Sequence, residues 1–360
     1  MDIVGNYRCS KMRISLKSVE NVIRETLHKY DVPETSIHVL INTIQYANQN
    51  GISTHGIRHL PMYVNKIKAG HLNPKDETSI ELDSGALMLL DANRTFGQVA
   101  AKHAVDYGMD KANEYGISMI GVRNSNTIGA AGFFGDYTAV RGYATLIFAN
   151  SAPAIAPTGG YKTIFGTNPI CFSFPGSNNN NPIVLDMATT VAARSKIRLA
   201  AKNGEKIPID WAIGPDGKAT DDPNLALLGS LLPIAGYKGY GLSLFVDLLA
   251  GLMTGSAYAG AVKPLSDMSS DSKNGQLFII IDVRKMMDNN ELNERIDYFC
   301  QSVKSCGEDG KIMLPGEPGY RKASEQRESV LISSREYEDI NRMAYDNGIS
   351  VRLEKMEEVN

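Results

Sequence analysis

The chain has 360 residues, of which 43% are hydrophobic and 21% charged, and its net charge is −3. This length can bury a large core, arranged as one large domain or two interlocked ones. The charge balance argues against a nucleic-acid or acidic-membrane partner, because both need clustered Lys and Arg. No apolar run of eighteen or more residues is present that could span a membrane.

The cysteines and the N-terminal residues indicate the cellular compartment of the protein. None of the four cysteines forms a C-x-x-C pair or a zinc-type spacing, so the sequence predicts no metal site. Cys300 and Cys306 could bridge, although reduced thiols are favoured. The opening MDIVGNYRCSKM has no signal-peptide core. We therefore expect a cytoplasmic protein in which residues 1–11 form a disordered extension.

Apolar spacing predicts most elements of the first half. Residues 16–48 show two apolar faces at helical spacing, and Pro33 separates them into two helices. A third, short helix is expected within 54–70, closed by Gly70. Further on, the pattern predicts a strand over 86–93 and a helix over 97–115. The segments SMIGVRNSN and YATLIFANS predict two more strands.

The second half alternates in the same way. Short apolar runs at 170–174 and 183–185 interrupt a stretch rich in Gly, Pro, Asn and Thr, which predicts strands joined by tight turns. Residues 241–252 are apolar almost all round, so we expect a central helix. A buried strand over 278–283 and a helix over 334–347 follow. The alternation predicts an α/β fold, but no G-x-G-x-x-G follows the first strand, so a Rossmann fold is not expected.

The stretch 150–196 is also the first candidate for binding. Tight turns expose backbone N–H groups, which suit a phosphate-bearing ligand. Three motifs here and further on are specific: GTNP at 166–169, LDMAT at 185–189 and GYKGYGLSL at 236–244. In this order and spacing they resemble the type-2 malate/L-lactate dehydrogenase family, and the resemblance covers roughly residues 12 to 350.

The resemblance implies an activity and an architecture. Members are nicotinamide-dependent 2-hydroxy-acid dehydrogenases and ketimine reductases with a non-Rossmann α/β fold. The implied cofactor is NAD or NADP, the substrate is a small molecule, and a homodimer with the site near the subunit boundary is expected. Residues 12–78 plus 288–360 would form a helical substructure from both chain ends. Residues 79–287 would form the dinucleotide-binding domain around a central sheet.

The segment THGIRHLPMY at 54–63 resembles the family's Ser-His-Gly-x-x-Arg motif. His55 matches the histidine that acts as acid/base in several members, and histidine titrates near physiological pH. Its alternative is a structural histidine bonded to a backbone carbonyl. Thr54 replaces the usual serine and keeps the hydroxyl. The family's arginine position holds His59, whereas Arg58 stands one residue earlier, about 100° away on a helix. Both are expected substrate-binding residues.

The segment NSNTIGAAGFF at 124–134 resembles the family's N-S-x-H-x-G-x-x-G motif. Thr127 stands where some members have a proton-accepting histidine. A threonine hydroxyl cannot serve as a general base at neutral pH without an activating neighbour, but it can donate a hydrogen bond to an oxyanion. We expect Thr127 to join His55 and Thr54 as a catalytic residue and Asn126 to bind substrate.

The implied cofactor-binding residues lie in four segments. Threonine hydroxyls, backbone N–H groups and a lysine are suited to pyrophosphate oxygens, and glycines before a helix allow close approach. The Pro-Gly-Glu loop at 315–317 would close over the cofactor. The expected contacts are Ser151, Asp186, Met187, Ala188, Thr189, Thr190, Lys238, Gly239, Gly316 and Glu317.

Two functions remain open from the sequence. The first is an NAD(P)-dependent oxidoreductase acting on a small 2-oxo or 2-hydroxy acid or a cyclic imine. The second is a catalytically silent paralogue that binds a dinucleotide or a partner, because Thr127 and His59 replace the expected histidine and arginine. Both functions would retain the cofactor motifs, so these motifs do not distinguish between them.

Overall fold

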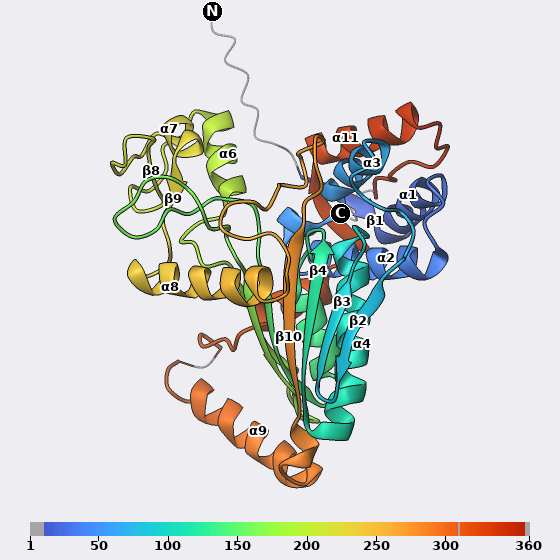
Figure 1. The fold of residues 1–360 in the computed structure, drawn as a ribbon, viewed down its shortest axis with the longest axis vertical. Helices are drawn as coiled ribbons and strands as arrows, with labels where there is room; N and C mark the ends of the chain where they lie inside the picture. The colour runs from blue at the N-terminus through green and yellow to red at the C-terminus, as the bar shows by residue number, and fades with distance from the viewer. Residues whose placement is uncertain (1–10, 309, 357–360) are drawn as a thin grey trace, which may run out of the picture.

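A seven-stranded mixed sheet forms the centre of the computed structural model, which describes residues 11–308 and 310–356 (Figure 1). Of its neighbouring strands, only β3 and β4 pair in parallel. This antiparallel order differs from a doubly wound parallel sheet, and the predicted non-Rossmann α/β class is confirmed. The strands, in spatial order, are β2 (Ser79–Ser84), β3 (Leu87–Asp91), β4 (Ile117–Ser125), β10 (Asn274–Asp282), β5 (Tyr143–Ala149), β6 (Ile170–Phe174) and β7 (Ile183–Met187).

One face of the sheet is covered by α4 (Gly97–Tyr115) and α5 (Ala131–Ala139). Small residues let α4 lie close: Gly108 faces Ile280, and a Cβ there would approach its Cδ1 to 2.5 Å. Gly116 ends the helix in the left-handed conformation, with φ 83°. The buried alanines of α4 therefore pack directly on β4 and β10.

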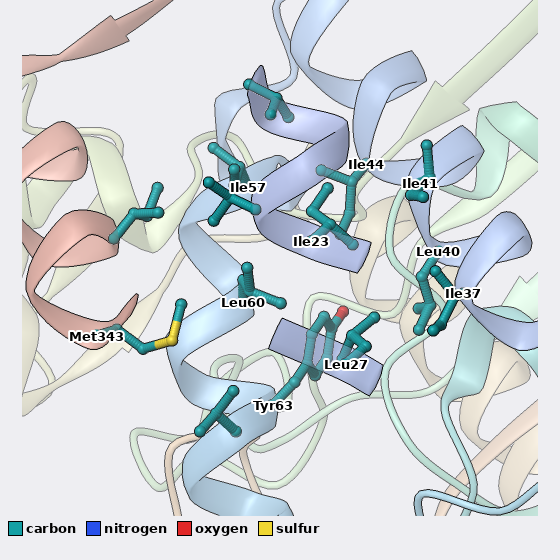
Figure 2. Packing of buried hydrophobic residues seen from close by; sticks show 14 of the residues in the cluster. Ile23, Leu27, Ile37, Leu40, Ile41, Ile44, Ile57, Leu60, Tyr63 and Met343 are labelled. Carbon is teal, nitrogen blue, oxygen red and sulfur yellow. The ribbon is translucent and has the colours of Figure 1, made fainter. Parts of the chain in front are cut away.

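A helical substructure from both chain ends packs at one end of the sheet. It comprises α1 (Leu16–His28), α2 (Glu34–Gln49), α3 (Leu60–Lys68) and α11 (Ser334–Asp346), with β1 (Lys11–Ser15) paired to β11 (Ser329–Ser333). Figure 2 shows its core, in which Ile23, Leu60 and Met343 come from α1, α3 and α11. Phe96 and Val99 also belong to this cluster, so the substructure shares packing with the start of α4.

Two further groups lie beside the sheet. In the first, α6 (Arg194–Asn203), α7 (Pro223–Leu228), β8 (Ala212–Ile213) and β9 (Ser230–Leu231) enclose a small core that Trp211 joins. In the second, α9 (Asn289–Lys304) packs Ile296 and Cys300 near Ile183 of β7, and α10 (Glu317–Glu325) follows it. Within residues 288–360, α9 therefore packs beside β7, whereas β11 and α11 pack with the chain's start.

The other face of the sheet carries α8 (Tyr237–Val246) and the π-helical turn η3 (Asp247–Leu252), which lie opposite α4 in Figure 1. The predicted start at 241 was wrong, because the helix begins directly after Gly236, whose φ is 63°. The expectation of a central helix was wrong as well. One side packs near Ile170, but Phe245 is 61% exposed in the single chain and Leu252 49%.

An apolar row crosses the part of this face that η3 leaves open. Strand register places Leu87, Met119, Ile279, Leu146, Phe172 and Leu185 side by side, one from each strand from β3 to β7. Phe172 is 41% exposed and Leu185 37%. Large contiguous apolar patches are rare on monomers, so this face is a candidate interface.

The remaining expectations have mixed outcomes. The predicted helices over 16–48, 54–70, 97–115 and 334–347 and the predicted strands are present within a few residues of their limits. Cys171, Cys300 and Cys306 are free thiols, so Cys300 and Cys306 do not bridge. Residues 1–10 of the expected extension lie outside the described residues, and Lys11 starts β1. In the described ranges, no helix has the length and apolar character needed to cross a membrane.

Candidate active site

Two consecutive 3₁₀ turns present the histidines. η1 (Ser53–His55) is followed by η2 (Ile57–His59), with Gly56 between them. Asn48 of α2 accepts a hydrogen bond from the Ile57 amide at 3.2 Å. A Cβ at position 56 would lie 1.9 Å from the Asn48 Oδ1, so only glycine allows this approach. The turn thus holds His55 and His59 on the same side of α2.

The two imidazoles lie edge to face. Their ring centroids are 5.6 Å apart with planes at 86°, and neither buried Nδ1 atom has a hydrogen-bond partner among the described residues. Burial lowers the pKa of His55 to about 4, and the nearby Arg58 charge adds to the effect. Burial, the neighbouring His55 and Arg58 lower the pKa of His59 to about 3. Both rings are therefore neutral at pH 7, each with one nitrogen free to accept a proton.

Arg58 points to another part of the surface. Its Nε lies 3.9 Å from the Glu336 carboxylate on α11, and its side chain is 40% exposed. Glu336 itself closes the capping box of α11 with Ser333. The guanidinium is thus directed toward the start of α11, while His59 keeps the inward position.

A chain of side chains joins the histidines to the segment after β4. The His59 ring lies 6.0 Å from that of Tyr63, whose hydroxyl accepts a hydrogen bond of 2.6 Å from the Gln98 side chain. Gln98 lies against Gly129, and Gly97 lies against the carbonyl of Thr127. Burial raises the pKa of Tyr63 to about 12, so it remains protonated. A series of contacts therefore runs from His55 through His59, Tyr63 and Gln98 to the segment that carries Thr127.

Asn126 is fixed in orientation. Its side-chain amide donates to the carbonyls of Arg94 at 2.9 Å and Thr95 at 3.0 Å, which leaves Oδ1 buried without a partner. The backbone carbonyl of Asn126 accepts from Gln276 of β10. This acceptor oxygen is preorganised, because the two carbonyls determine which end of the amide faces them.

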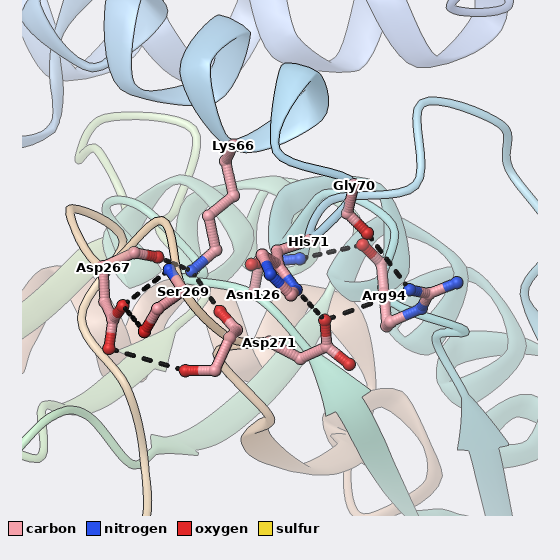
Figure 3. A network of polar contacts seen from close by, with 9 residues as sticks. Lys66, Gly70, His71, Arg94, Asn126, Asp267, Ser269 and Asp271 are labelled. Atoms are coloured by element: carbon pink, nitrogen blue, oxygen red, sulfur yellow. Dashed lines mark hydrogen bonds and ion pairs between the residues drawn. The ribbon is translucent and has the colours of Figure 1, made fainter.

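The support of Asn126 extends to the segment 264–273 (Figure 3). The Arg94 guanidinium donates to the Gly70 carbonyl and lies 3.9 Å from Asp271, which is bonded to His71 at 2.8 Å. Lys66 of α3, fully buried, donates to the carbonyls of Asp267 and Ser270. A polar loop in the sequence is thus attached to α3 by a buried ammonium group.

Asp186 connects the segment 124–134 to the LDMAT motif. Its Oδ2 accepts a hydrogen bond of 2.7 Å from the Gly132 amide at the start of α5. Desolvation raises the pKa of this carboxyl to about 6, although the Gly132 bond opposes the shift. The Tyr46 hydroxyl of α2 lies beside Gly132 as well, next to Asp186. The segment that holds Thr127 and the strand that carries LDMAT therefore meet at this bond.

Two further cofactor candidates, Ser151 and Thr189, meet at Thr167 near the end of β7. The Ser151 hydroxyl lies 3.3 Å from that of Thr167, and the Ser151 amide donates to Asn168 at 3.0 Å. The amide and hydroxyl of Thr189 both donate to the Thr167 carbonyl at 2.9 Å. Asn168 adopts φ 32° and donates to Ser243 of α8, so the GTNP turn links these segments.

Comparison with known proteins identifies the family. Residues 14–341 match the family model described as malate/L-lactate dehydrogenase. An L-sulfolactate dehydrogenase from Methanothermobacter thermautotrophicus is 34% identical over 96% of this chain and 100% of its own length. The chain belongs to the malate/L-lactate dehydrogenase family. It is therefore an oxidoreductase of a family of pyridine-nucleotide dehydrogenases that act on hydroxy acids.

Solved structures agree with this membership. The sulfolactate dehydrogenase from Methanocaldococcus jannaschii superposes with a TM-score of 0.88 at 31% identity, over 94% of this chain and 98% of that chain. A Δ1-piperideine-2-carboxylate reductase from Pseudomonas syringae pvar. tomato gives a TM-score of 0.82 at 27% identity, over 93% and 100%. The fold is thus shared by proteins named for C–OH and for C=N substrates.

In this family member, the residues at the end of β7 fit a dinucleotide. The Thr190 hydroxyl is buried and has no partner, and the exposed Lys238 ammonium has no recorded bond within the described ranges. Gly239 is buried in the first turn of α8, where a Cβ would lie 2.3 Å from the Ile234 carbonyl. Ile234 also donates its amide to the Thr189 carbonyl. A free hydroxyl, a free cation and a helix N-terminus suit pyrophosphate.

Gly316 and Glu317 lie elsewhere. The Pro315 carbonyl accepts from the Val184 amide at the start of β7, and Gly316 adopts φ 96°. Glu317 bonds the Leu314 amide and lies 2.5 Å from the Lys304 ammonium of α9. No hydrogen bond or ion pair between described residues joins this pair to Ser151, Thr189 or Lys238. Met187 is the last residue of β7 and Ala188 follows it, and both are partly exposed.

Several supporting residues were not predicted from the sequence. Tyr63, Gln98 and Gln276 connect the catalytic candidates, and Lys66 with Asp271 supports Asn126 indirectly. Tyr63 belongs to the THGIRHLPMY segment and stands four residues after His59. On a helix this spacing predicts that the two side chains are neighbours. The contacts of Gln98 and Gln276 depend on tertiary packing, and no local sequence pattern predicts them.

Proposed function

We propose that this protein transfers a hydride between a nicotinamide dinucleotide and a small 2-oxo or 2-hydroxy acid or a cyclic imine. Membership of the family carries the reaction class. The observation that carries the site is the cluster that joins His55 through Tyr63 and Gln98 to the Thr127 segment. That segment is bonded to the LDMAT strand through Gly132 and Asp186.

His55 is the proposed acid/base. As a neutral imidazole at pH 7, it can accept the hydroxyl proton of a 2-hydroxy acid while the hydride leaves the same carbon. The cofactor, when bound, accepts or supplies that hydride. In the reverse direction protonated His55 returns the proton to the oxygen or nitrogen. The buried Nδ1 without a partner leaves one ring nitrogen available for this exchange.

The remaining residues orient the substrate. Thr54 and Thr127 provide hydroxyl donors beside the carbonyl oxygen, and the fixed Oδ1 of Asn126 accepts from a substrate hydroxyl or N–H group. Thr127 has only a long contact of 3.5 Å with the Gly129 amide, so its hydroxyl remains available. On this assignment Thr127 stabilises charge and does not act as the base.

The cofactor would lie along the end of β7. We assign the pyrophosphate to Thr189, Thr190 and the N-terminus of α8, with Lys238 as the counter-charge. Ser151 and Asp186 would contact the nicotinamide half, since Asp186 meets the substrate segment at Gly132. Gly316 and Glu317 remain proposed contacts from the loop beside β7. The choice between NAD and NADP is left to measurement.

Cofactor binding and turnover test this function together. Trp211 packs beside the 232–234 segment, because its carbonyl accepts from the Leu232 amide. We expect NADH or NADPH to quench Trp211 fluorescence and to be oxidised with a 2-oxo acid or a cyclic imine.

A His55→Ala variant should bind the cofactor as before and lose turnover by about 10²–10⁴-fold, the usual contribution of general acid–base catalysis. Unchanged turnover in this variant would remove His55 from the mechanism.

The silent paralogue remains the second candidate, favoured by Thr127 in place of histidine. Replacing Thr127 with His separates the two. Because the wild-type hydroxyl is proposed to serve a working site, we expect unchanged or reduced turnover. A gain of two or more orders of magnitude over an almost inactive wild type would instead indicate a decayed active site.

We further propose that two copies form a homodimer. The apolar row from Leu87 to Leu185 lacks charged side chains, and the exposed Phe245 and Leu252 of α8 and η3 extend it. Because an uncharged apolar face is complementary to itself, a second copy of this chain is the occupant that fits best.

A further inference from the structure

The His55–His59 pair has two buried ring nitrogens that no group in the described part of the protein satisfies. The rings are 5.6 Å apart, and each has a buried Nδ1 without a partner. A buried polar atom that no group in the protein satisfies is rare, and it is costly unless something external pairs with it. Two such atoms on neighbouring, edge-to-face rings of the candidate site point to a ligand that bonds both.

The one permanent positive charge close to the pair belongs to Arg58, and that side chain is directed away from the rings. Arg58, on the same turn, is directed to Glu336 of α11. From α3 the nearest group is Tyr63, which is protonated. From α2 the neighbour is the neutral side chain of Asn48. At that position the Arg58 charge still lowers the pKa of both rings.

We propose that His55 and His59 together hold the substrate's carboxylate, and that the pair takes up a proton as that carboxylate arrives. This inference rests on the proposed function, because it assigns the substrate's charged group to one wall of the same site. An anion entering a site with low dielectric constant pairs far better with an imidazolium than with a neutral ring. The substrate therefore enters together with its counter-charge.

This proton is distinct from the one consumed in the reaction. Reduction of a 2-oxo acid takes one hydride from the dinucleotide and one proton, which His55 delivers to the carbonyl oxygen. The proton taken up on binding stays on His59 beside the carboxylate and leaves when the product carboxylate leaves. The proton that His55 delivers is taken from solvent and is consumed in the reaction. The overall reaction is unchanged, and only the binding step gains a proton.

Linkage gives the expected sign. The free rings have low pKa values, about 4 and about 3, and a bound carboxylate raises them. Between the free and the bound values, affinity is highest at low pH and falls tenfold for each pH unit as pH rises. Above the bound value the dependence levels off.

Calorimetry tests the proposal on the full-length protein. Oxamate, an unreactive analogue of a 2-oxo acid, is titrated with and without NADH at pH 7, in two buffers that differ in ionisation enthalpy. We expect uptake of close to one proton per oxamate, and an affinity about tenfold weaker at pH 7 than at pH 6.

Two variants serve as matched tests, each checked for a wild-type melting temperature. His59→Gln should weaken oxamate binding at least tenfold at pH 6. His59→Arg should bind oxamate with no proton uptake and little dependence on pH. NADH affinity should be the same in all three proteins, because His59 lies outside the proposed dinucleotide segments.

The outcomes separate this inference from the proposed function. Oxamate binding without proton uptake in the wild type overturns the pair's role and leaves the oxidoreductase function intact. Failure of NADH to bind, with oxamate still bound and a proton taken up, overturns the cofactor assignment and supports the pair. Absence of binding by both ligands overturns both.

Discussion

At the scale of single residues, the sequence indicated candidate positions but not the contacts between them. The roles of His55 and Thr127 stay predictions, and the contacts between their segments run through Tyr63 and Gln98. The role of Gly56 depends on how closely Asn48 approaches it. That distance depends on how α2 packs against the turn, and the pattern of apolar residues in the sequence does not predict it.

The same histidines predict how stability depends on pH. Their pKa values in the folded protein, about 4 and about 3, lie below the unfolded value near 6.5. Below pH 6.5 the unfolded chain therefore binds more protons than the folded protein. The contribution of the two neutral rings to the free energy of unfolding is complete above pH 6.5 and is lost as pH falls below it. We expect His59→Gln to lose less stability than the wild type between pH 7.5 and pH 5.

Urea midpoints at the two pH values measure this difference. His38→Gln, on an exposed position of α2, is the control and should follow the wild type. Parallel losses in wild type and His59→Gln would contradict the neutral assignment of the buried ring.

At the scale of elements, the spacing of apolar residues predicted the helices that bury one face. It failed for the helix that is apolar on all sides. The spacing in α1, α2 and α11 matches their burial, whereas α8 was predicted too short and too central. The fault lies in the assumption that an all-round apolar helix is buried within its own chain. α9 and α10, with largely polar exposed surfaces, were not predicted.

The contact between α4 and the site predicts one sensitive glycine. A Cβ at Gly97 would lie 2.2 Å from the Asn126 carbonyl and 2.3 Å from that of Thr127, both backbone atoms that cannot rotate away. We expect Gly97→Ala to cost about 1–3 kcal/mol of unfolding free energy, the usual range for overpacking. Turnover should also fall, because the displaced segment carries Thr127.

Chemical denaturation and steady-state kinetics check this expectation. Gly241→Ala is the matched stability control, since no atom lies within 4 Å of the added Cβ and alanine favours the helix. Equal stability of the two variants would show that the close approach at Gly97 has been overestimated.

At the scale of the whole molecule, the sheet has one covered and one partly open face. The row from Leu87 to Leu185 could not be found from sequence, because register between distant strands brings it together. The family resemblance, by contrast, predicted the non-Rossmann architecture over nearly the whole chain. Neither source alone indicates which surface a second copy would cover.

A single charge placed in this row tests the dimer. Phe172→Asp would place a carboxylate at the middle of the proposed interface, where desolvation without a partner is costly. We expect the mass measured by light scattering to fall from two chains to one. Leu228→Asp, at a 74% exposed position on α7, should leave the dimer unchanged. A monomeric wild type would rule out the proposal directly.

The pairing of β1 with β11 has a consequence for how the protein is made. Strand β1 meets β11 in five matched residue pairs more than 300 positions away along the chain, and the core that holds the histidine turn uses side chains from both regions. During synthesis the first three helices emerge long before the strand and helix that cover them. The histidine turn therefore lacks this support until residues 329–346 have been synthesised, and the nascent chain must keep that apolar surface from aggregating meanwhile.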